Sequence, residues 1–358
     1  MKRIDQYIFK KYLGTFFYAI SLLIVIVVIF DISENIDDFL KKNAPLKAVI
    51  FDYYLNFIPY FINLFVYLFT FIAVIFFTSK MAGNSEIIAI LSSGISFWRM
   101  LWPYFLASLL LAVVSLYFGN ILIPHTNQQR REFKNLYMED LYKDRERNIH
   151  VQIEKGVYAY VEHYNSKLNV GYRFSLEKYN GYELVYKLAA DRIELDTNTQ
   201  GWIIHNFYER SLDSLQEHFT RGERKDTVLN LVPTDLYEIK EDFEVMNFWE
   251  LRRHIENERL KGNAGVVVYE VEMHKRMAAP AAILILTLIG VALSSRKVRR
   301  GIGVHLGAGI AITFAYILFM QFSTVFATYG NLSPALAAWI PNIIFFVLSI
   351  YLVIKAPK

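Results

Sequence analysis

The sequence predicts a polytopic α-helical membrane protein with six transmembrane helices and an extracytoplasmic β-rich, β-jellyroll-like domain between the third and fourth. Three observations predict this class. Hydrophobic residues make up 54% of the 358 residues, above the roughly 45–50% of an ordinary soluble domain. The apolar runs lie at both ends of the chain, whereas the middle is a charged, globular-type sequence. Within that middle, apolar residues alternate with polar ones, a pattern typical of strands.

Six apolar segments approach the roughly 20 residues that a bilayer-spanning helix requires. The first is too long for a signal peptide, and no small-residue cleavage site follows it, so we expect it to be retained. The chain then divides into spans one to three (1–124), the β-rich domain (125–265) and spans four to six (266–358). The expected spans are Tyr12–Ile32, Leu55–Thr78, Met100–Ile123, Met277–Ser294, Ile302–Tyr329 and Ala335–Ile354.

Lysine and arginine residues predict the orientation of the spans, because short cytoplasmic loops are enriched in them. They gather at the N-terminus, in the link between spans two and three, in the SSRKVRRG link between spans four and five, and at the C-terminus. All four places fall on one side of a six-span protein. We therefore expect both termini in the cytoplasm and the large polar region outside, which is the periplasm if the cell is Gram-negative.

The polar region begins with a charged stretch that can continue the third span as a helix, and it then changes to a period of two. Four alternating runs rich in Val, Ile, Tyr and Phe predict strands, and Asn180-Gly181 predicts a hairpin between two of them. Before the fourth span, Asn247 and Glu250 have the spacing of a capping box. They predict the start of a helix that ends at Gly262.

The sequence carries no recognisable catalytic or metal-binding motif. It lacks the ATP-binding P-loop, the H-E-x-x-H zinc motif and the G-x-S-x-G nucleophile motif. It has no cysteine, which excludes disulfides and thiolate metal sites. The net charge of +4 comes with no basic, aromatic-interleaved patch, so a nucleic-acid partner is not expected. We expect no enzyme activity, metal or cofactor, and any directional work must draw energy from a partner.

Two features of the membrane region admit both a structural and a functional interpretation. Gly303 and Gly307 have the G-x-x-x-G spacing that allows close helix packing, either inside the chain's own bundle or against a partner subunit. The stretch GNSEIIAILSSGIS, residues 83–96, predicts a short amphipathic helix along the cytoplasmic face, with Ile87, Ile88, Leu91 and Ile95 on its apolar side. Asn84 or Ser85 can cap that helix, and Glu86 in its first turn is favoured by the helix dipole. The helix is either a capped surface turn or a docking element for a cytoplasmic ATPase.

The same stretch resembles the coupling helix of the lipopolysaccharide-export permeases, the LptF/LptG (YjgP/YjgQ) family, in which Ser-Glu opens the helix and a small residue followed by Gly closes it. Other segments resemble the same family: IDQYIFKKY at the N-terminus, RMAAPAAI at the start of the fourth span, and YGNLSPALAAWIP in the last hairpin. DDFLKK after the first span resembles the LptG branch, toward which the overall length also leans. The resemblance covers nearly the whole membrane part and, for the outer domain, its architecture.

The resemblance implies a permease subunit of an ATP-binding-cassette exporter. It would extract lipopolysaccharide from the outer leaflet of the inner membrane and pass it to a periplasmic bridge for delivery to the outer membrane. The implied partners are a second LptF/LptG-type permease, a cytoplasmic ATPase dimer that hydrolyses the ATP, LptC-like and LptA-like bridge proteins, and lipopolysaccharide. The coupling helix would span 83–97, with contacts to the ATPase at Ser85, Glu86, Ile87, Leu91 and Gly94.

Two further sites follow from the resemblance. Lys41 and Lys42 would bind the anionic head group of the lipid, although a basic residue of the LptG branch is replaced here by Asn35. Without the resemblance, the two lysines are interfacial anchors of a span end. Spans one and five would form lateral gates with the partner permease, which gives the Gly303 and Gly307 face a use. The competing function is a non-transport membrane scaffold or sensor with a periplasmic β domain.

Overall fold

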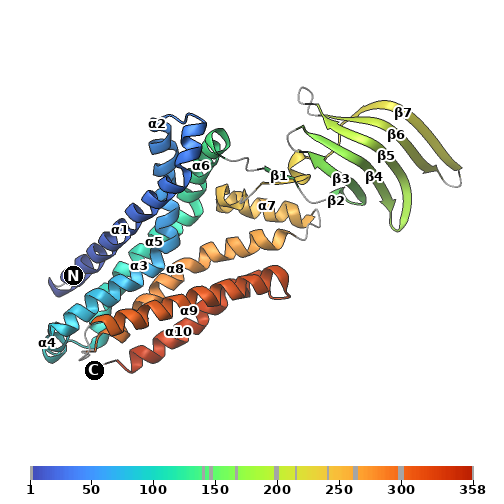
Figure 1. The fold of residues 1–358 in the computed structure, drawn as a ribbon. Coiled ribbons are helices and arrows are strands. Elements are labelled where there is room, and N and C mark those ends of the chain that lie inside the picture. The colour runs from blue at the N-terminus through green and yellow to red at the C-terminus, as the bar shows by residue number, and fades with distance from the viewer. Residues whose placement is uncertain are drawn as a thin grey trace. The chain divides into compact units, whose positions relative to one another are not determined.

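The computed structural model describes residues 3–138, 142–144, 148–165, 168–196, 201–213, 216–239, 242–260, 265–296 and 302–356. The chain forms two compact units. The first, helical unit comprises Met1–Met138, Phe243–Arg252 and Val267–Lys358, and the second, β-rich unit comprises Glu139–Asp242 and Arg253–Val266. Figure 1 shows the helices and strands of both units.

Six helical stretches among the described residues are long and apolar enough to cross a membrane, which confirms the predicted number. Two of them are built from consecutive segments: α2, η1 and α3 form the second, and α5, η2 and α6 form the third. The helices are α1 (Arg3–Lys41), α2 (Leu46–Ala48), η1 (Val49–Tyr54), α3 (Leu55–Gly83), α4 (Glu86–Ser92), α5 (Phe97–Tyr117), η2 (Phe118–Leu122), α6 (Ile123–Tyr137), α8 (Val266–Ser294), α9 (Ile302–Tyr329) and α10 (Pro334–Ile354).

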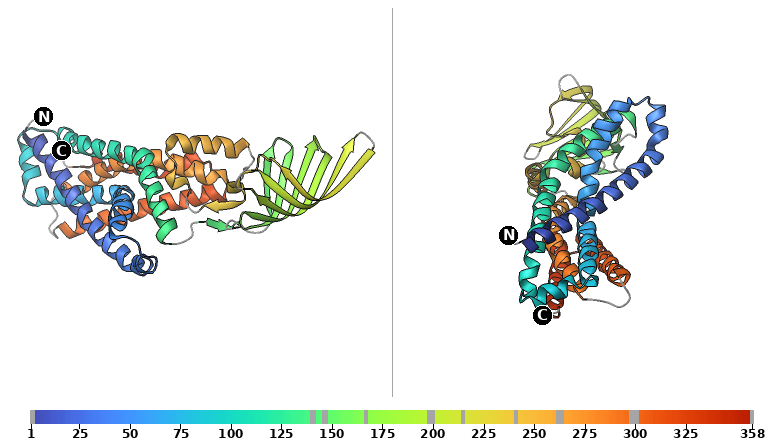
Figure 2. Two further views of the ribbon diagram at one scale, coloured as in Figure 1. Left: turned by 90° about the horizontal axis from the view of Figure 1, so that it is seen from above. Right: turned by 90° about the vertical axis from the view of Figure 1, so that its left-hand side faces the viewer.

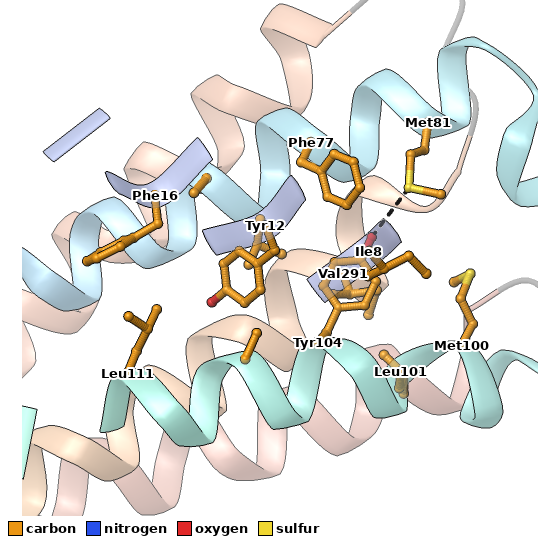
Figure 3. Close-up of a cluster of buried hydrophobic side chains, with 14 of the residues drawn as sticks. Ile8, Tyr12, Phe16, Phe77, Met81, Met100, Leu101, Tyr104, Leu111 and Val291 are labelled. Carbon is orange, nitrogen blue, oxygen red and sulfur yellow. Dashed lines mark hydrogen bonds between the residues drawn. The ribbon is translucent and has the colours of Figure 1, made fainter. Parts of the chain in front are cut away.

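The first helix packs on the bundle over its N-terminal half and again near its end, where Phe39 is buried among residues of η1, α3 and α6. Its buried residues recur at helical spacing from Asp5 to Ile20, and the next is Phe39. Figure 3 shows Ile8, Tyr12 and Phe16 of α1 among side chains of α3 and α5. In the most apolar window of α1 only 11% of residues are buried, against 61% for α8. Because this apolar window presents so much surface outside the bundle, it faces lipid or a partner chain.

Buried polar side chains link neighbouring spans. The Tyr12 hydroxyl lies 3.0 Å from Thr287 Oγ1 and joins α1 to α8. In α10, the Asn342 side chain accepts a hydrogen bond from Tyr316 of α9 (2.9 Å) and donates one to the Ala278 carbonyl of α8 (2.9 Å). Since an unpaired polar group is costly in hydrocarbon, such bonds favour one arrangement of these helices.

Two segments of the spans are π-helical, and the sequence pattern did not predict them. In η1, the carbonyls of Phe51 and Asp52 accept hydrogen bonds from Asn56 Nδ2 at 3.1 and 2.9 Å. The second, η2, ends just before Pro124, which lacks the amide hydrogen that a regular helix would use. The widened turns are therefore accommodated by a side-chain amide in one case and by a proline in the other.

The β-rich unit contains a six-stranded antiparallel sheet in the order β2-β3-β4-β5-β6-β7, so each strand pairs with its neighbour in sequence. A separate two-stranded pair joins β1 to β8. These strands confirm the predicted β-rich domain between the third and fourth spans. Their bounds are β1 (Tyr142–Asp144), β2 (Ile149–Glu154), β3 (Val157–Asn165), β4 (Val170–Asn180), β5 (Glu183–Leu195), β6 (Trp202–Asp213), β7 (Gln216–Thr227) and β8 (Tyr237–Ile239).

One face of the sheet carries the hydrophobic core of this unit, which includes Val161, Phe174 and Trp202. The predicted hairpin is confirmed: Asn180 pairs with Glu183 across a two-residue turn, with Gly181 at φ +65°. Cross-strand ion pairs support the ladder. Lys187 Nζ donates to a Glu177 carboxylate oxygen at 2.7 Å, and this bond lowers the pKa of the Glu177 carboxyl.

Both helices predicted beside the strands are present. The charged stretch after the third span is α6, which ends at Tyr137. The helix before the fourth span is α7 (Phe248–Leu260). Its capping box is formed, because Asn247 Oδ1 accepts from the Glu250 amide at 3.0 Å and the Glu250 carboxylate accepts from the Asn247 amide at 2.9 Å. Gly262, where we expected the end, lies outside the described residues.

Candidate functional site

The link between the second and third spans contains a seven-residue helix, α4, within the predicted range of 83–97. Ser85 precedes it in the left-handed conformation, at φ +61°, and its side chain makes no capping hydrogen bond to the helix. Gly94 follows the helix at φ +82°, and its amide donates to the Leu91 carbonyl at 3.1 Å. Glycine favours this conformation, so Gly94 ends α4 and lets α5 begin at Phe97.

Glu86 starts α4 and is held by neighbours on both carboxylate oxygens. Asn84 Nδ2 donates to Oε1 at 3.0 Å, and the hydroxyl of Tyr7, from the first helix, donates to Oε2 at 3.3 Å. The carboxylate also lies in the first turn, where the helix dipole favours negative charge. Glu86 is therefore oriented partly by a residue 79 positions away in sequence, which no local pattern indicates.

The apolar residues of α4 divide differently from our expectation. Ile87 is buried in the same core cluster as Ile8 of α1, and Leu91 packs partly buried against that cluster. Ile88, expected beside them on the apolar side, is 56% exposed. The helix thus packs on its own bundle through Ile87 and Leu91, and its exposed residues are Ile88, Ala89 and Ser92.

A second contact joins the start of the first helix to the start of α5. Arg99 Nη2 lies 2.6 Å from Asp5 Oδ2, and the Asp5 side chain is only 7% exposed. Ser96 caps α5 by accepting a hydrogen bond from the Arg99 amide, and this cap fixes the position of Arg99 in the first turn of the helix. The basic residues of this link predicted only the orientation of the spans, and no sequence pattern indicated that Arg99 pairs with Asp5.

Lys41 and Lys42 both lie exposed at the end of the first helix. Lys42 Nζ donates to the Met138 carbonyl at the end of α6. Asn35 donates to the carbonyl of Asp31, and the Asp31 carboxylate accepts from the hydroxyls of Tyr53 (3.3 Å) and Tyr54 (3.0 Å). These tyrosines tie the end of α1 to η1, so the two lysines project from a fixed position.

Three glycines near the start of α9 differ in their surroundings. A Cβ atom added at Gly303 or Gly307 would meet no other atom within 4 Å, whereas one at Gly309 would lie 2.2 Å from Ile75 Cδ1 of α3. Close packing inside the chain's own bundle therefore involves Gly309 and not the Gly303 and Gly307 pair. In the same region, His305 Nδ1 lies 2.7 Å from Ser79 Oγ and links α9 to α3.

The described residues contain no group of three or more His, Cys, Asp or Glu side chains that could hold a metal ion. Of the basic SSRKVRRG link, Lys297, Arg299 and Arg300 lie outside the described residues. Arg296, at its start, donates to the carbonyl of Lys355. The link therefore begins beside the end of α10.

The chain matches the family model described as lipopolysaccharide export system permease LptF/LptG over residues 6–355. The match includes the spans, the strands and the α4 link. The chain belongs to the LptF/LptG family. No curated protein matches its sequence. As a member of this family it is a multi-pass membrane protein and a permease, which is a transport subunit and not an enzyme.

Proposed function

We propose that this LptF/LptG-family chain is a permease subunit of an ATP-binding-cassette exporter that extracts lipopolysaccharide from the outer leaflet of the inner membrane and passes it to a periplasmic bridge. The family match supports the lipid and the export role. The observation that carries the ATPase-driven mechanism is α4, a short helix whose carboxylate is oriented by Asn84 and Tyr7 and whose Ile88 is exposed.

In this proposal α4 docks on a cytoplasmic ATPase. Ile87 and Leu91 hold the helix on its own bundle, so a force on the exposed side is transmitted to the transmembrane helices and does not detach α4. Glu86 supplies the charge that a basic residue of the ATPase recognises, and Gly94 sets the angle between α4 and α5. Ser85, in its left-handed conformation, sets the corresponding angle at the start.

The proposed orientation places α4 and both termini in the cytoplasm and the β-rich domain in the periplasm. The N-terminus, the C-terminus and α4 lie at one end of the helical unit (Figures 1 and 2). Lys10, Lys11 and Lys80 are exposed near this end, as expected for a cytoplasmic face.

A second permease of the same family would complete the lipid path. The exposed apolar side chains of α1 and α9 support a gate between the two chains, and the open Gly303 and Gly307 face lets a partner helix approach closely. Lys41 and Lys42 would hold the anionic head group at the periplasmic end of α1. From there the lipid would pass along the β-rich domain to LptC-like and LptA-like bridge proteins.

The proposal is tested by purifying the chain from its native membrane and identifying the bound proteins and lipids. We expect a cytoplasmic ATPase, a second six-span permease and lipopolysaccharide. Recovery of the chain without an ATPase, under conditions that preserve other transporter complexes, would instead favour a scaffold or sensor.

Glu86→Ala tests the coupling step. We expect unchanged protein level and thermal stability but at least about tenfold less lipopolysaccharide exported per ATP, because a charged hydrogen bond of about 1.5–3 kcal/mol is lost. Glu183→Ala removes an exposed carboxylate of the β-rich unit and is the matched control. Export at the wild-type ratio in Glu86→Ala would exclude this role.

A further inference from the structure

The segment from Glu86 to Arg99 is linked to the first helix near both of its ends. At Glu86 the link is the Tyr7 hydroxyl, at 3.3 Å from the carboxylate. At Arg99 the link is the Asp5 carboxylate, at 2.6 Å from the guanidinium. Asp5 and Tyr7 lie in the first two turns of α1, while Glu86 begins α4 and Arg99 lies in the first turn of α5. Two polar contacts from the start of α1 therefore hold the α4 link near both of its ends.

Apolar packing between these two contacts makes the connection stiff. Ile8 of α1 and Ile87 of α4 are both almost fully buried and belong to the same core cluster, together with Phe97 at the start of α5. The Tyr7 ring packs edge-on against Phe77 of α3, with centroids 6.1 Å apart. Because densely packed groups cannot slide freely past one another, a displacement of α4 displaces the start of α1 as well.

Between Ile20 and Phe39 no residue of α1 is buried, so the middle of the helix depends on its two ends for support, and its start is a mechanical control point. Ile20 is the last buried residue in the N-terminal half of α1, and Phe39 is the next buried residue along the helix. A straight helix transmits motion along its axis, and 39 residues extend over roughly 58 Å at about 1.5 Å per residue. Movement at Asp5 and Tyr7 can therefore reach the middle of α1, which lies between its start and the contacts of Asp31 with Tyr53 and Tyr54.

We propose that Asp5 and Tyr7 are positioning residues that couple α4 to the first helix, so that α1 follows the coupling helix when the ATPase moves it. Asp5 acts through Arg99, and Tyr7 acts through Glu86. The proposal rests on the proposed function for the source of the motion, but the mechanical link itself is a property of this chain. Opening of the α1 gate and the ATPase cycle are then joined within one polypeptide, without a further partner.

Two variants isolate the contacts. Tyr7→Phe removes only the hydroxyl and keeps the ring against Phe77, so it has no reason to misfold. Asp5→Asn removes the charge of a nearly buried carboxylate, and the exchange Asp5→Arg with Arg99→Asp restores an opposite-charge pair. If the Asp5–Arg99 ion pair itself is needed, the charge exchange restores the wild-type behaviour. If the single substitution only impairs folding, the exchange does not restore it.

The first measurement does not depend on transport. The native sequence has no cysteine, so spin labels can be placed at Ser92→Cys on α4 and Tyr18→Cys on α1, both at exposed positions. In the purified chain we expect one narrow distribution of distances between the labels. The distribution of distances should broaden in the variant that combines Tyr7→Phe with Asp5→Asn. It should be narrow again in the variant that keeps Tyr7 and carries the exchange Asp5→Arg with Arg99→Asp. An unchanged distribution in the combined variant would overturn the proposal.

The second measurement uses the assembled complex and records lipopolysaccharide released per ATP hydrolysed. We expect ATP hydrolysis within about twofold of the unmodified complex and a ratio at least about fivefold lower in the combined variant, at the low end of typical coupling between sites. An unchanged ratio would overturn the proposal. An unmodified complex that releases no lipopolysaccharide would refute the proposed function instead, and the label distances would still decide whether α1 and α4 are linked.

Discussion

Lys41 and Lys42 are adjacent in sequence but differ in their contacts. Lys42 donates to the Met138 carbonyl, so part of its bonding capacity is already used within the chain. Lys41 is exposed at the helix end. If the pair binds an anionic head group, Lys41 has the greater freedom to follow the ligand.

We therefore predict that Lys41→Glu weakens photocrosslinking of lipopolysaccharide to the end of α1 more than Lys42→Glu does. The expected loss for Lys41 is about 1 kcal/mol, or roughly fivefold, the usual contribution of one cation near an anionic lipid surface. Lys47→Glu reverses the charge of another exposed lysine beyond the end of α1 and is the control. Equal crosslinking in all three variants would mean that the lysines only anchor the helix at the interface.

Arg276 shows how a single side chain fixes the short segment 243–246, just before α7. It donates to the carbonyls of Met246 and Phe243, each at 2.7 Å, and to Glu272 at 3.1 Å. Its side chain is only 8% exposed. From the other side, Asn127 of α6 donates to the Glu244 carbonyl at 3.2 Å. The segment is thus held between α6 and α8.

We predict that Arg276→Ala lowers the free energy of unfolding by about 2–4 kcal/mol, since two backbone carbonyls and a carboxylate lose a buried donor. The expected observation is a lower thermal midpoint in detergent. Lys275→Ala, whose partner is also Glu272 but whose side chain is 40% exposed, should cost less than about 1 kcal/mol. Similar effects for the two variants would contradict the assignment of Arg276 as the main support.

At the scale of single helices, α9 contains glycines with two different roles. One allows close packing inside the bundle, and the others leave a face open to a partner helix. Gly309 allows α9 to approach Ile75 of α3, whereas Gly303 and Gly307 have open space around them. Their spacing alone was compatible with either use. Only the rotation of α9 in the bundle distinguishes them.

The same substitution at two of these glycines separates folding from assembly. We predict that Gly309→Leu lowers the stability of the isolated chain by about 2 kcal/mol through overpacking. Gly307→Leu should change it by less than about 0.5 kcal/mol but should reduce co-purification of a second permease. Thermal unfolding and pull-down from the membrane measure the two effects. Normal pairing in Gly307→Leu would exclude this face from the interface.

Elements with a strong period were predictable, and irregular ones were not. The alternating runs predicted the strands, and Asn247 with Glu250 predicted the cap of α7, because both signals are local. The π-helical turns η1 and η2 depend on how Asn56 and Pro124 are accommodated, which periodicity does not report. Ile88 was placed on the wrong side of α4 because Ile87 and Ile88 are equally apolar, and only burial against α1 distinguishes them.

For the whole molecule, the family resemblance and the count of spans were sufficient to predict the architecture, but long-range contacts were not. Asp5 and Arg99 are separated by 94 positions, and Tyr7 and Glu86 by 79. A single sequence contains no signal that pairs such residues. The candidate site was therefore predicted at Glu86 and its neighbours, while the residues that orient them came from the structure.

The orientation of the whole chain in the membrane can be tested with single cysteines, since the native sequence has none. We predict that Tyr182→Cys, at the fully exposed β4–β5 turn, reacts with a membrane-impermeant maleimide once the outer membrane is permeabilised. Ser92→Cys on α4 should react only after the inner membrane is broken, because the basic residues around it favour the cytoplasm. The reverse pattern would place α4 in the periplasm, out of reach of any cytoplasmic ATPase. It would thereby refute the coupling mechanism as a whole, whereas the contacts between α1 and α4 would be unaffected.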